Sequence, residues 1–111
     1  MKTFFQMPEL QHQLEIAGKR YREFLRVPAM SAGIYVLPVG AEDTQFPHNE
    51  DEIYYVVRGR ARMQVGSKEN LIEDEEVAPG SVIFVGAKTV HRFYDIVEEL
   101  VVLVCFAPAE S

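Results

Sequence analysis

The sequence contains little cysteine, few basic residues and no long apolar run. Cys105 is the only cysteine in 111 residues, so no internal disulfide can form, and its place in an apolar run indicates a small buried side chain. Eleven basic against 17 acidic residues give a net charge of −6, which argues against a nucleic-acid partner or an anionic membrane surface. The longest apolar run, Leu100–Ala107, is far too short to cross a membrane.

The sequence also lacks repeats, low-complexity tracts, linkers and the sustained N-terminal apolar segment of a signal peptide. We therefore expect a cytoplasmic protein. The composition, 48% hydrophobic and 25% charged, is ordinary for a globular chain, and 111 residues suit one domain. We expect a helical segment over residues 1–20 and a β domain over residues 21–111.

The periodicity of apolar residues changes from helical to extended near residue 20. Spacing from Met7 to Tyr21 predicts a helix over residues 8–17, with Pro8 early in it and Gly18 at its end. Gly59 is interpreted as a turn, and the acidic run Glu73–Glu76 as a solvated loop. Short strands separated by Gly and Pro predict an all-β sandwich or barrel. The predicted strands are Tyr21–Val27, Ser31–Leu37, Glu52–Arg58, Ala61–Val65, Asn70–Glu73, Ser81–Val85, His91–Asp95 and Leu100–Phe106.

Two of these strands are apolar on both faces, namely the segments at Ile53–Val57 and Val101–Phe106. An antiparallel sheet with one solvated face should instead alternate. The outer face therefore needs a cover, and one short helix can hardly cover both strands. Because large exposed apolar patches are uncommon on monomers, we predict a homodimer.

His48 lies just before the strongest predicted strand. In extended chain, alternate side chains share a face, so Phe46, His48, Glu50 and Glu52 are expected to point the same way, followed by Tyr54. This face would carry an imidazole and carboxylates beside apolar side chains, as a ligand-lined pocket does. Histidines and glutamates at strand starts are also common as plain solvent-exposed residues, so spacing alone leaves both interpretations open.

His91 begins another predicted strand and shares its expected face with Phe93 and Asp95. Two neutral imidazoles and one carboxylate on a rigid sheet would suit a divalent first-row metal and leave positions open for water or a substrate. His48 and His91 are far apart in the sequence, so local spacing does not establish that they meet.

The stretch from Gly40 to Gly59 resembles the first signature of the cupin superfamily. That signature is Gly, five residues, His-x-His, three or four residues, Glu, six residues, Gly. The spacing fits throughout, with His48 at the second His and Glu52 at the Glu, but Phe46 replaces the first His.

The stretch from Gly80 to Asp95 resembles the second cupin signature, which is Gly, five residues, Pro-x-Gly, two residues, His, three residues, Asn. His91 matches the His, whereas Gly86, Lys88 and Asp95 replace the Pro, Gly and Asn. The two signatures cover about a third of the chain. The resemblance implies a small antiparallel jelly-roll β-barrel, often dimeric.

The resemblance also implies a metal inside the barrel, held here by His48, Glu52 and His91, with Asp95 as an outer hydrogen-bond acceptor or a strand-end residue. The first His of the family set has no counterpart, which lowers the expected affinity. Iron, manganese, nickel, copper and zinc all suit two His and one Glu, so the sequence does not choose among these divalent ions.

Glu50 is a substitute ligand in this scheme if a bulge brings it inward, or else a solvated acid in a turn; Gln45 is a weaker substitute. Phe46, Glu50, Tyr54 and Phe93 are the expected pocket residues. Three functions remain open: a metal-dependent oxygenase or isomerase acting on a small anionic metabolite, a non-catalytic barrel that binds a small molecule with weak or no metal, and a structural barrel.

Overall fold

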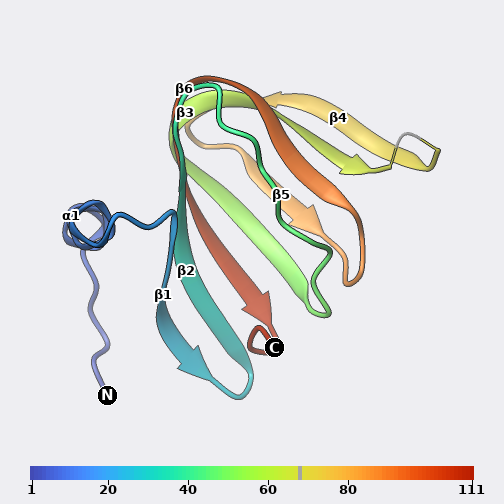
Figure 1. The fold of residues 1–111 in the computed structure, drawn as a ribbon. Coiled ribbons are helices and arrows are strands. Elements are labelled where there is room, and N and C mark those ends of the chain that lie inside the picture. Colours follow the sequence, from blue (N-terminus) through green and yellow to red (C-terminus); the bar gives the residue numbers. More distant parts are fainter. Residues whose placement is uncertain (68) are drawn as a thin grey trace.

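The computed structural model describes residues 1–67 and 69–111, in which one helix precedes six strands of a single curved sheet (Figure 1). The strand order is β1-β2-β6-β3-β4, and β5 pairs with β3; all pairs are antiparallel. The all-β class with a short N-terminal helix is as the sequence predicts. The elements are α1 (Met7–Ala17), β1 (Tyr21–Val27), β2 (Met30–Leu37), β3 (Asp51–Gly66), β4 (Leu71–Val77), β5 (Val82–Val85) and β6 (His91–Ala107).

Helix α1 begins and ends where the sequence signals place it. A proline lies in its first turn, and Gly18 adopts a left-handed conformation (φ +64°) that terminates the helix. Leu10 and Leu14 are buried against Ile34 of β2. The helix therefore packs beside β1 and β2 at one side of the sheet (Figure 1), and the rest of the outer face lies beyond its reach.

The predicted turn at Gly59 is wrong, because β3 runs through it and pairs with β6 on both sides. The β3–β6 register shifts between Val56 and Arg62, and Gly59 has φ +100°. A Cβ at Gly59 would overlap the backbone carbonyl of Glu99. The glycine thus permits a bulge with close strand approach, not a reversal of the chain. Two long strands replace the four short ones expected there.

The acidic run Glu73–Glu76 is likewise not a loop but part of β4. It pairs with the second half of β3, where Met63 opposes Glu75. Arg62 of β3 holds Asp74 by an ion pair of 3.1 Å. Backbone pairing and this cross-strand contact allow an acidic segment to form an edge strand whose carboxylates remain solvated.

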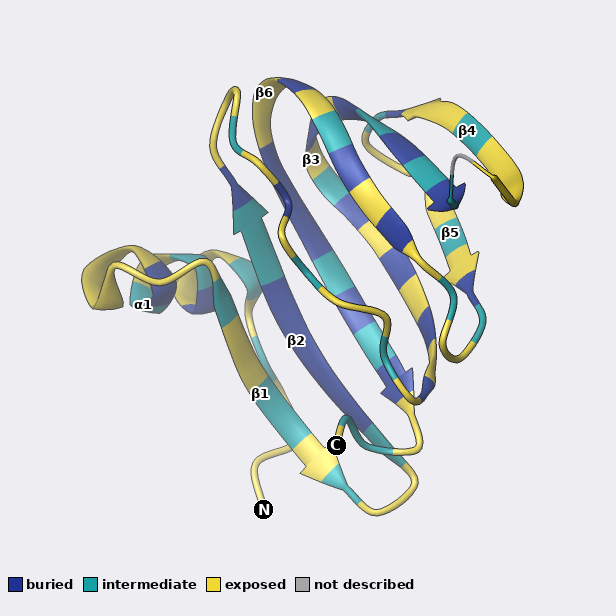
Figure 2. Cartoon of the chain, turned by 45° about the vertical axis from the view of Figure 1, so that its right-hand side comes forward, coloured by how far each residue is buried: buried dark blue, intermediate teal, exposed yellow. Residues whose placement is uncertain are grey.

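The core lies on the concave side of the sheet, and buried residues alternate with exposed ones along β3 and β6 (Figure 2). Its members are contributed mainly by β3 and β6, and the largest include Tyr54, Phe93 and Leu100. Within the described residues, no helix is long and apolar enough to cross a membrane. The curvature places the inner faces of distant strand ends opposite one another, which is what positions the site.

Candidate metal centre

His48, Glu52 and His91 converge inside the curved sheet. Each offers one ligand atom, and these atoms lie within 4.8 Å of one another. His48 lies in the segment before β3, Glu52 is the second residue of β3, and His91 is the first residue of β6. Glu52 and His91 are buried, with 2% and 3% of their surfaces exposed. The structure therefore brings together the three residues that the sequence selected.

The hydrogen bonds of His91 fix its ring. Nδ1 lies 2.8 Å from the carbonyl oxygen of Thr89, which can only accept, so Nδ1 carries the proton. Burial lowers the pKa of His91, so the ring is neutral and Nε2 presents a lone pair. That lone pair faces Glu52 Oε1 at 3.1 Å and the Tyr54 hydroxyl at 3.1 Å. His91 is thus oriented as a metal-ligating histidine is.

His48 is held in a similar way by a residue near the other end of the chain. Its Nδ1 lies 3.1 Å from Oε2 of Glu110, which accepts the ring proton. Burial also lowers the pKa of His48. In the neutral tautomer that carries its proton on Nδ1, Nε2 has a free lone pair and faces the amide oxygen of Gln45 at 3.2 Å. The carboxylate on Nδ1 leaves Nε2 to ligate, as in carboxylate–histidine–metal arrangements.

The carboxyl group of Glu52 has an unusually high pKa. Burial, partly offset by the Tyr54 hydroxyl, raises the pKa of Glu52 to about 7. Its Oε2 is buried and has no hydrogen-bond partner among the described residues. A proton or a cation between the carboxylate of Glu52 and Nε2 of His91 would give both groups a partner.

The donor set fits a divalent cation. Nε2 of His48 lies 3.2 Å from Oε1 of Gln45, and Nε2 of His91 lies 3.1 Å from Oε1 of Glu52. The hydroxyl of Tyr54 lies between these two pairs, 2.9 Å from Gln45 and 3.1 Å from His91. Acceptors crowded together without protons repel, and a metal ion removes that repulsion. Neutral imidazole and carboxylate suit first-row metals.

The expected pocket residues divide into two groups. Tyr54 and Phe93 are fully buried beside the centre, with ring centroids 5.2 Å apart. Glu50 is buried too, but its Oε2 accepts a hydrogen bond from the backbone of Ser111. Phe46 is 82% exposed, so the expectation that it shares the face of His48 is wrong. Residues before β3 are not in a strand, and alternation does not hold there.

Asp95 also departs from its expected face. It has φ +48° and is exposed, at the point where β6 bulges against β3. Phe93 and Ile96 are both buried, so the period of two is broken between them. The bulge turns Asp95 away from His91, and it supplies no outer hydrogen bond to that ring.

Sequence reasoning gave little weight to Gln45 and missed Asp43 and Glu110. Gln45 contacts both His48 and Tyr54 through its amide oxygen. Asp43 is buried and accepts a hydrogen bond from Nε2 of Gln45 at 2.7 Å. Both are in the irregular segment between β2 and β3, where no periodicity identifies the inward residues. Glu110 is distant in the sequence, and no local pattern links it to His48.

A cavity of about 190 Å³ adjoins the centre. Gln45, His48 and Tyr54 form one wall, and Glu110 lies at another. The rest of the lining is mostly aromatic or apolar: Tyr21, Tyr35, Val104 and Phe106, with Thr44. Among the described residues that line it there is neither lysine nor arginine.

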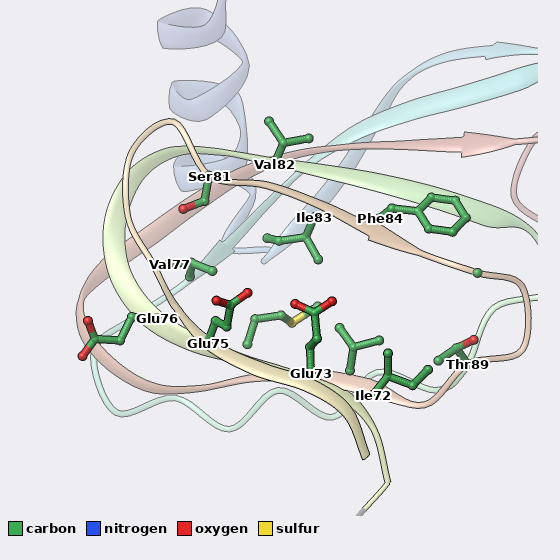
Figure 3. Close-up of a pocket in the computed structure, with 13 residues that line it drawn as sticks. Ile72, Glu73, Glu75, Glu76, Val77, Ser81, Val82, Ile83, Phe84 and Thr89 are labelled. Atoms are coloured by element: carbon green, nitrogen blue, oxygen red, sulfur yellow. The ribbon is translucent and has the colours of Figure 1, made fainter. Parts of the chain in front are cut away.

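A larger hollow of about 620 Å³ lies between β4 and β5 (Figure 3). It is lined by apolar side chains such as Ile83 and Val77 and by Glu73 and Glu75, which point from β4 towards β5. Its described lining contains no histidine, and the glutamates in it are solvent-exposed. The smaller cavity is therefore the candidate site on chemical grounds.

Comparisons with known proteins agree with this architecture. The sequence model of the Cupin domain matches residues 33–106. Uncharacterized protein SCO3923 of Streptomyces coelicolor is 44% identical over 107 residues, covering 96% of this chain and 97% of that protein. BH2720 from Bacillus halodurans superposes with a TM-score of 0.77 at 21% identity, over 96% of this chain and 82% of that one. KdgF from Halomonas sp. gives 0.67 at 21% identity, over 79% and 76%. The two solved structures share the fold.

Proposed function

The chain belongs to the cupin family, and on that basis we propose that it binds a divalent metal ion through His48, Glu52 and His91 and uses that ion to bind a small oxygen-donor ligand. The observation that carries the proposal is the convergence of two neutral imidazole lone pairs and a buried carboxylate that lacks a full set of partners. Bound there, a divalent metal acts as a Lewis acid or, if it is iron, as a site for O₂.

The ligand is proposed to be small and anionic, such as a keto acid, an enediolate or a catecholate. A divalent ion and Glu52 together carry a charge near +1, which an anionic oxygen pair would neutralise. The aromatic walls of the 190 Å³ cavity suit a planar molecule. Because the described lining includes no lysine or arginine, the metal would be the positive group that attracts the ligand.

The chain's own residues would orient this ligand and exclude water. Phe106 packs edge-on against His48, with ring centroids 4.8 Å apart, and walls the cavity. Burial raises the pKa of Tyr54 well above its usual value, so its hydroxyl remains a hydrogen-bond donor at neutral pH. By turning its hydroxyl proton away from Oε1 of Gln45, Tyr54 would donate a hydrogen bond to a ligand oxygen that develops negative charge. Oxygenase or isomerase chemistry would use this donor.

The test is elemental analysis of protein purified without a histidine tag, followed by titration with a catechol and a keto acid before and after treatment with EDTA. We expect near one metal per chain, and ligand binding that disappears with the metal. Protein that binds no divalent ion, even when the ion is added, would contradict the proposal. Ligand binding that survives EDTA would indicate a metal-free binding barrel, and oxygen uptake would distinguish an oxygenase from a binder.

We also propose that the protein is a homodimer through the outer face of β3 and β5. Ile53 opposes Phe84 and Tyr55 opposes Val82 across these strands, and all four side chains are substantially exposed. This patch lies beyond α1, which packs on β1 and β2 (Figure 1). Exposed aromatic and aliphatic clusters of this kind favour a protein partner.

Sedimentation at micromolar concentration should give a mass twice the 12.6 kDa of one chain. Phe84→Asp should shift the protein to the monomer, since a charge in an apolar interface is costly to desolvate. Val97→Asp is the matched control, because Val97 is as exposed as Phe84 but lies on β6, outside the patch on β3 and β5. A wild-type protein that sediments only as a monomer would end this proposal.

A further inference from the structure

Gln45 supplies the ligand that the sequence lacks at Phe46. We infer that the side-chain amide oxygen of Gln45 is the fourth protein ligand of the metal centre, beside His48, Glu52 and His91. This inference rests on the proposed metal binding. It assigns a role to a residue of the irregular segment between β2 and β3, one position before the exposed Phe46.

Asp43 fixes which way the amide of Gln45 points. The carboxylate oxygen Oδ2 of Asp43 accepts a hydrogen bond from Gln45 Nε2 at 2.7 Å. A carboxylate oxygen cannot donate, so the NH₂ group faces Asp43 and the carbonyl oxygen faces the other way. On that other side the hydroxyl of Tyr54 donates to Gln45 Oε1 at 2.9 Å, which agrees with the same orientation. The oxygen is therefore aimed at His48 and Tyr54.

The oxygen is also at the distance that a shared ion requires. Two ligands at right angles around one ion, each about 2.1 Å from it, lie roughly 3.0 Å apart. Gln45 Oε1 is 3.2 Å from His48 Nε2, and Glu52 Oε1 is 3.1 Å from His91 Nε2. Both distances are close to that value, so each pair matches an edge of one coordination shell.

Asp43, which holds the amide of Gln45, is itself held by hydrogen bonds to two strands. Asp43 is 8% exposed and accepts hydrogen bonds from the backbone N–H of Phe93 on β6 at 2.9 Å and from the hydroxyl of Tyr35 on β2 at 2.8 Å. It thus ties the irregular segment to two strands of the sheet. Ligands held by an outer hydrogen bond keep their orientation, and metal sites commonly rely on that support.

The hydrogen bond from Tyr54 does not compete with an ion. A carbonyl oxygen has two lone pairs, so Gln45 Oε1 can accept from Tyr54 and ligate at the same time. Glu50 is the other substitute that the sequence offered. Its Oε2 accepts from the backbone N–H of Ser111 and its buried Oε1 has no partner among the described residues, but Glu50 is not part of the convergent group of two histidines and Glu52. The geometry therefore favours Gln45 over Glu50 as the replacement for the missing histidine.

The experiment measures the affinity of EDTA-stripped protein for Mn²⁺ and Co²⁺ by calorimetry in four variants. Gln45→Leu removes the oxygen and is expected to weaken binding by at least about tenfold. Gln45→Glu keeps an oxygen ligand but loses the hydrogen bond to Asp43, so its affinity should lie between those of Gln45→Leu and the wild type. Gln6→Leu is the matched control, because Gln6 is an exposed glutamine before α1 whose side chain makes no capping hydrogen bond, and it should bind within about twofold of the wild type. His91→Ala should not bind.

The visible absorption of the Co²⁺-loaded protein gives a second readout, since it reports the number and type of ligands. Gln45→Leu should change this spectrum and Gln6→Leu should not. Equal affinities and spectra for the wild type and Gln45→Leu, with binding lost in His91→Ala, would overturn the role of Gln45 alone. Absence of ion binding in the wild type would overturn the metal proposal itself. If Gln45→Leu does not fold, Gln45→Ala is measured in its place with the same criteria.

Discussion

Protein carrying His91→Ala is expected to retain almost none of the divalent metal that the wild type holds. The side chain of His91 is wholly buried, and its neutral Nε2 faces Glu52 at 3.1 Å. Removing it takes away one of two nitrogen ligands, so Glu52 and His48 are left to hold the ion. We expect at least a hundredfold weaker binding, on the order of 3 kcal/mol or more.

Elemental analysis after gel filtration without added metal measures this loss. His12→Ala is the matched control, because His12 is the third histidine and is exposed on α1, and it should keep the wild-type metal content. His48→Ala is a second test with less risk to folding, since the side chain of His48 is 18% exposed. Full metal content in both His48→Ala and His91→Ala would show that the ion, if present, binds elsewhere.

The sequence located the three convergent residues because the cupin signatures carry long-range information that periodicity lacks. Glu52 begins β3 and pairs with Phe106 on β6, whereas His91 pairs with Val65 at the far end of β3. Along a flat sheet these two residues would lie far apart. They meet because the sheet curves, and curvature is set by bulges and strand packing over the whole chain.

Periodicity failed where the backbone is not a regular strand. Phe46 and Gln45 precede β3, so alternation could not say which of the two points inward; the anchor at Asp43 decides it. Gly59 resembled a turn because a glycine with φ above zero serves a turn and a bulge equally well. The contact between Glu110 and His48 depends on how residues 108–111 fold back over the sheet. Arg26 holds this segment by donating to the backbone carbonyl of Glu110.

Glu52→Gln is expected to change how the stability of the metal-free protein depends on pH. In the folded chain the pKa of Glu52 is raised to about 7 from 4.5, chiefly by burial. Below about pH 4.5 Glu52 is protonated in both states and contributes nothing to the pH dependence. Between the two pKa values the unfolded chain releases the proton and the folded chain keeps it. Glu52 therefore makes the free energy of unfolding fall as pH rises through this window.

Glutamine cannot ionise, so Glu52→Gln removes this decline. Each unit of pKa difference between the folded and unfolded states is worth about 1.4 kcal/mol. The variant should therefore gain on the order of 2–3 kcal/mol over the wild type on going from about pH 4 to about pH 8. His48 and His91 act in the opposite direction, because burial lowers their pKa values and favours unfolding as pH falls below their usual range. Comparing the variant with the wild type at each pH isolates Glu52.

Urea denaturation of EDTA-treated protein at a series of pH values measures the two curves. Adding a divalent metal near pH 8 should stabilise the wild type strongly and Glu52→Gln weakly, since ligation requires the ionised carboxylate and replaces its missing partner. The metal affinity of the wild type should rise with pH through about 7, as Glu52 loses its proton. Parallel stability curves for the two proteins would show that Glu52 is not held protonated by its buried position, and the electrostatic argument for a cation at this carboxylate would then fail.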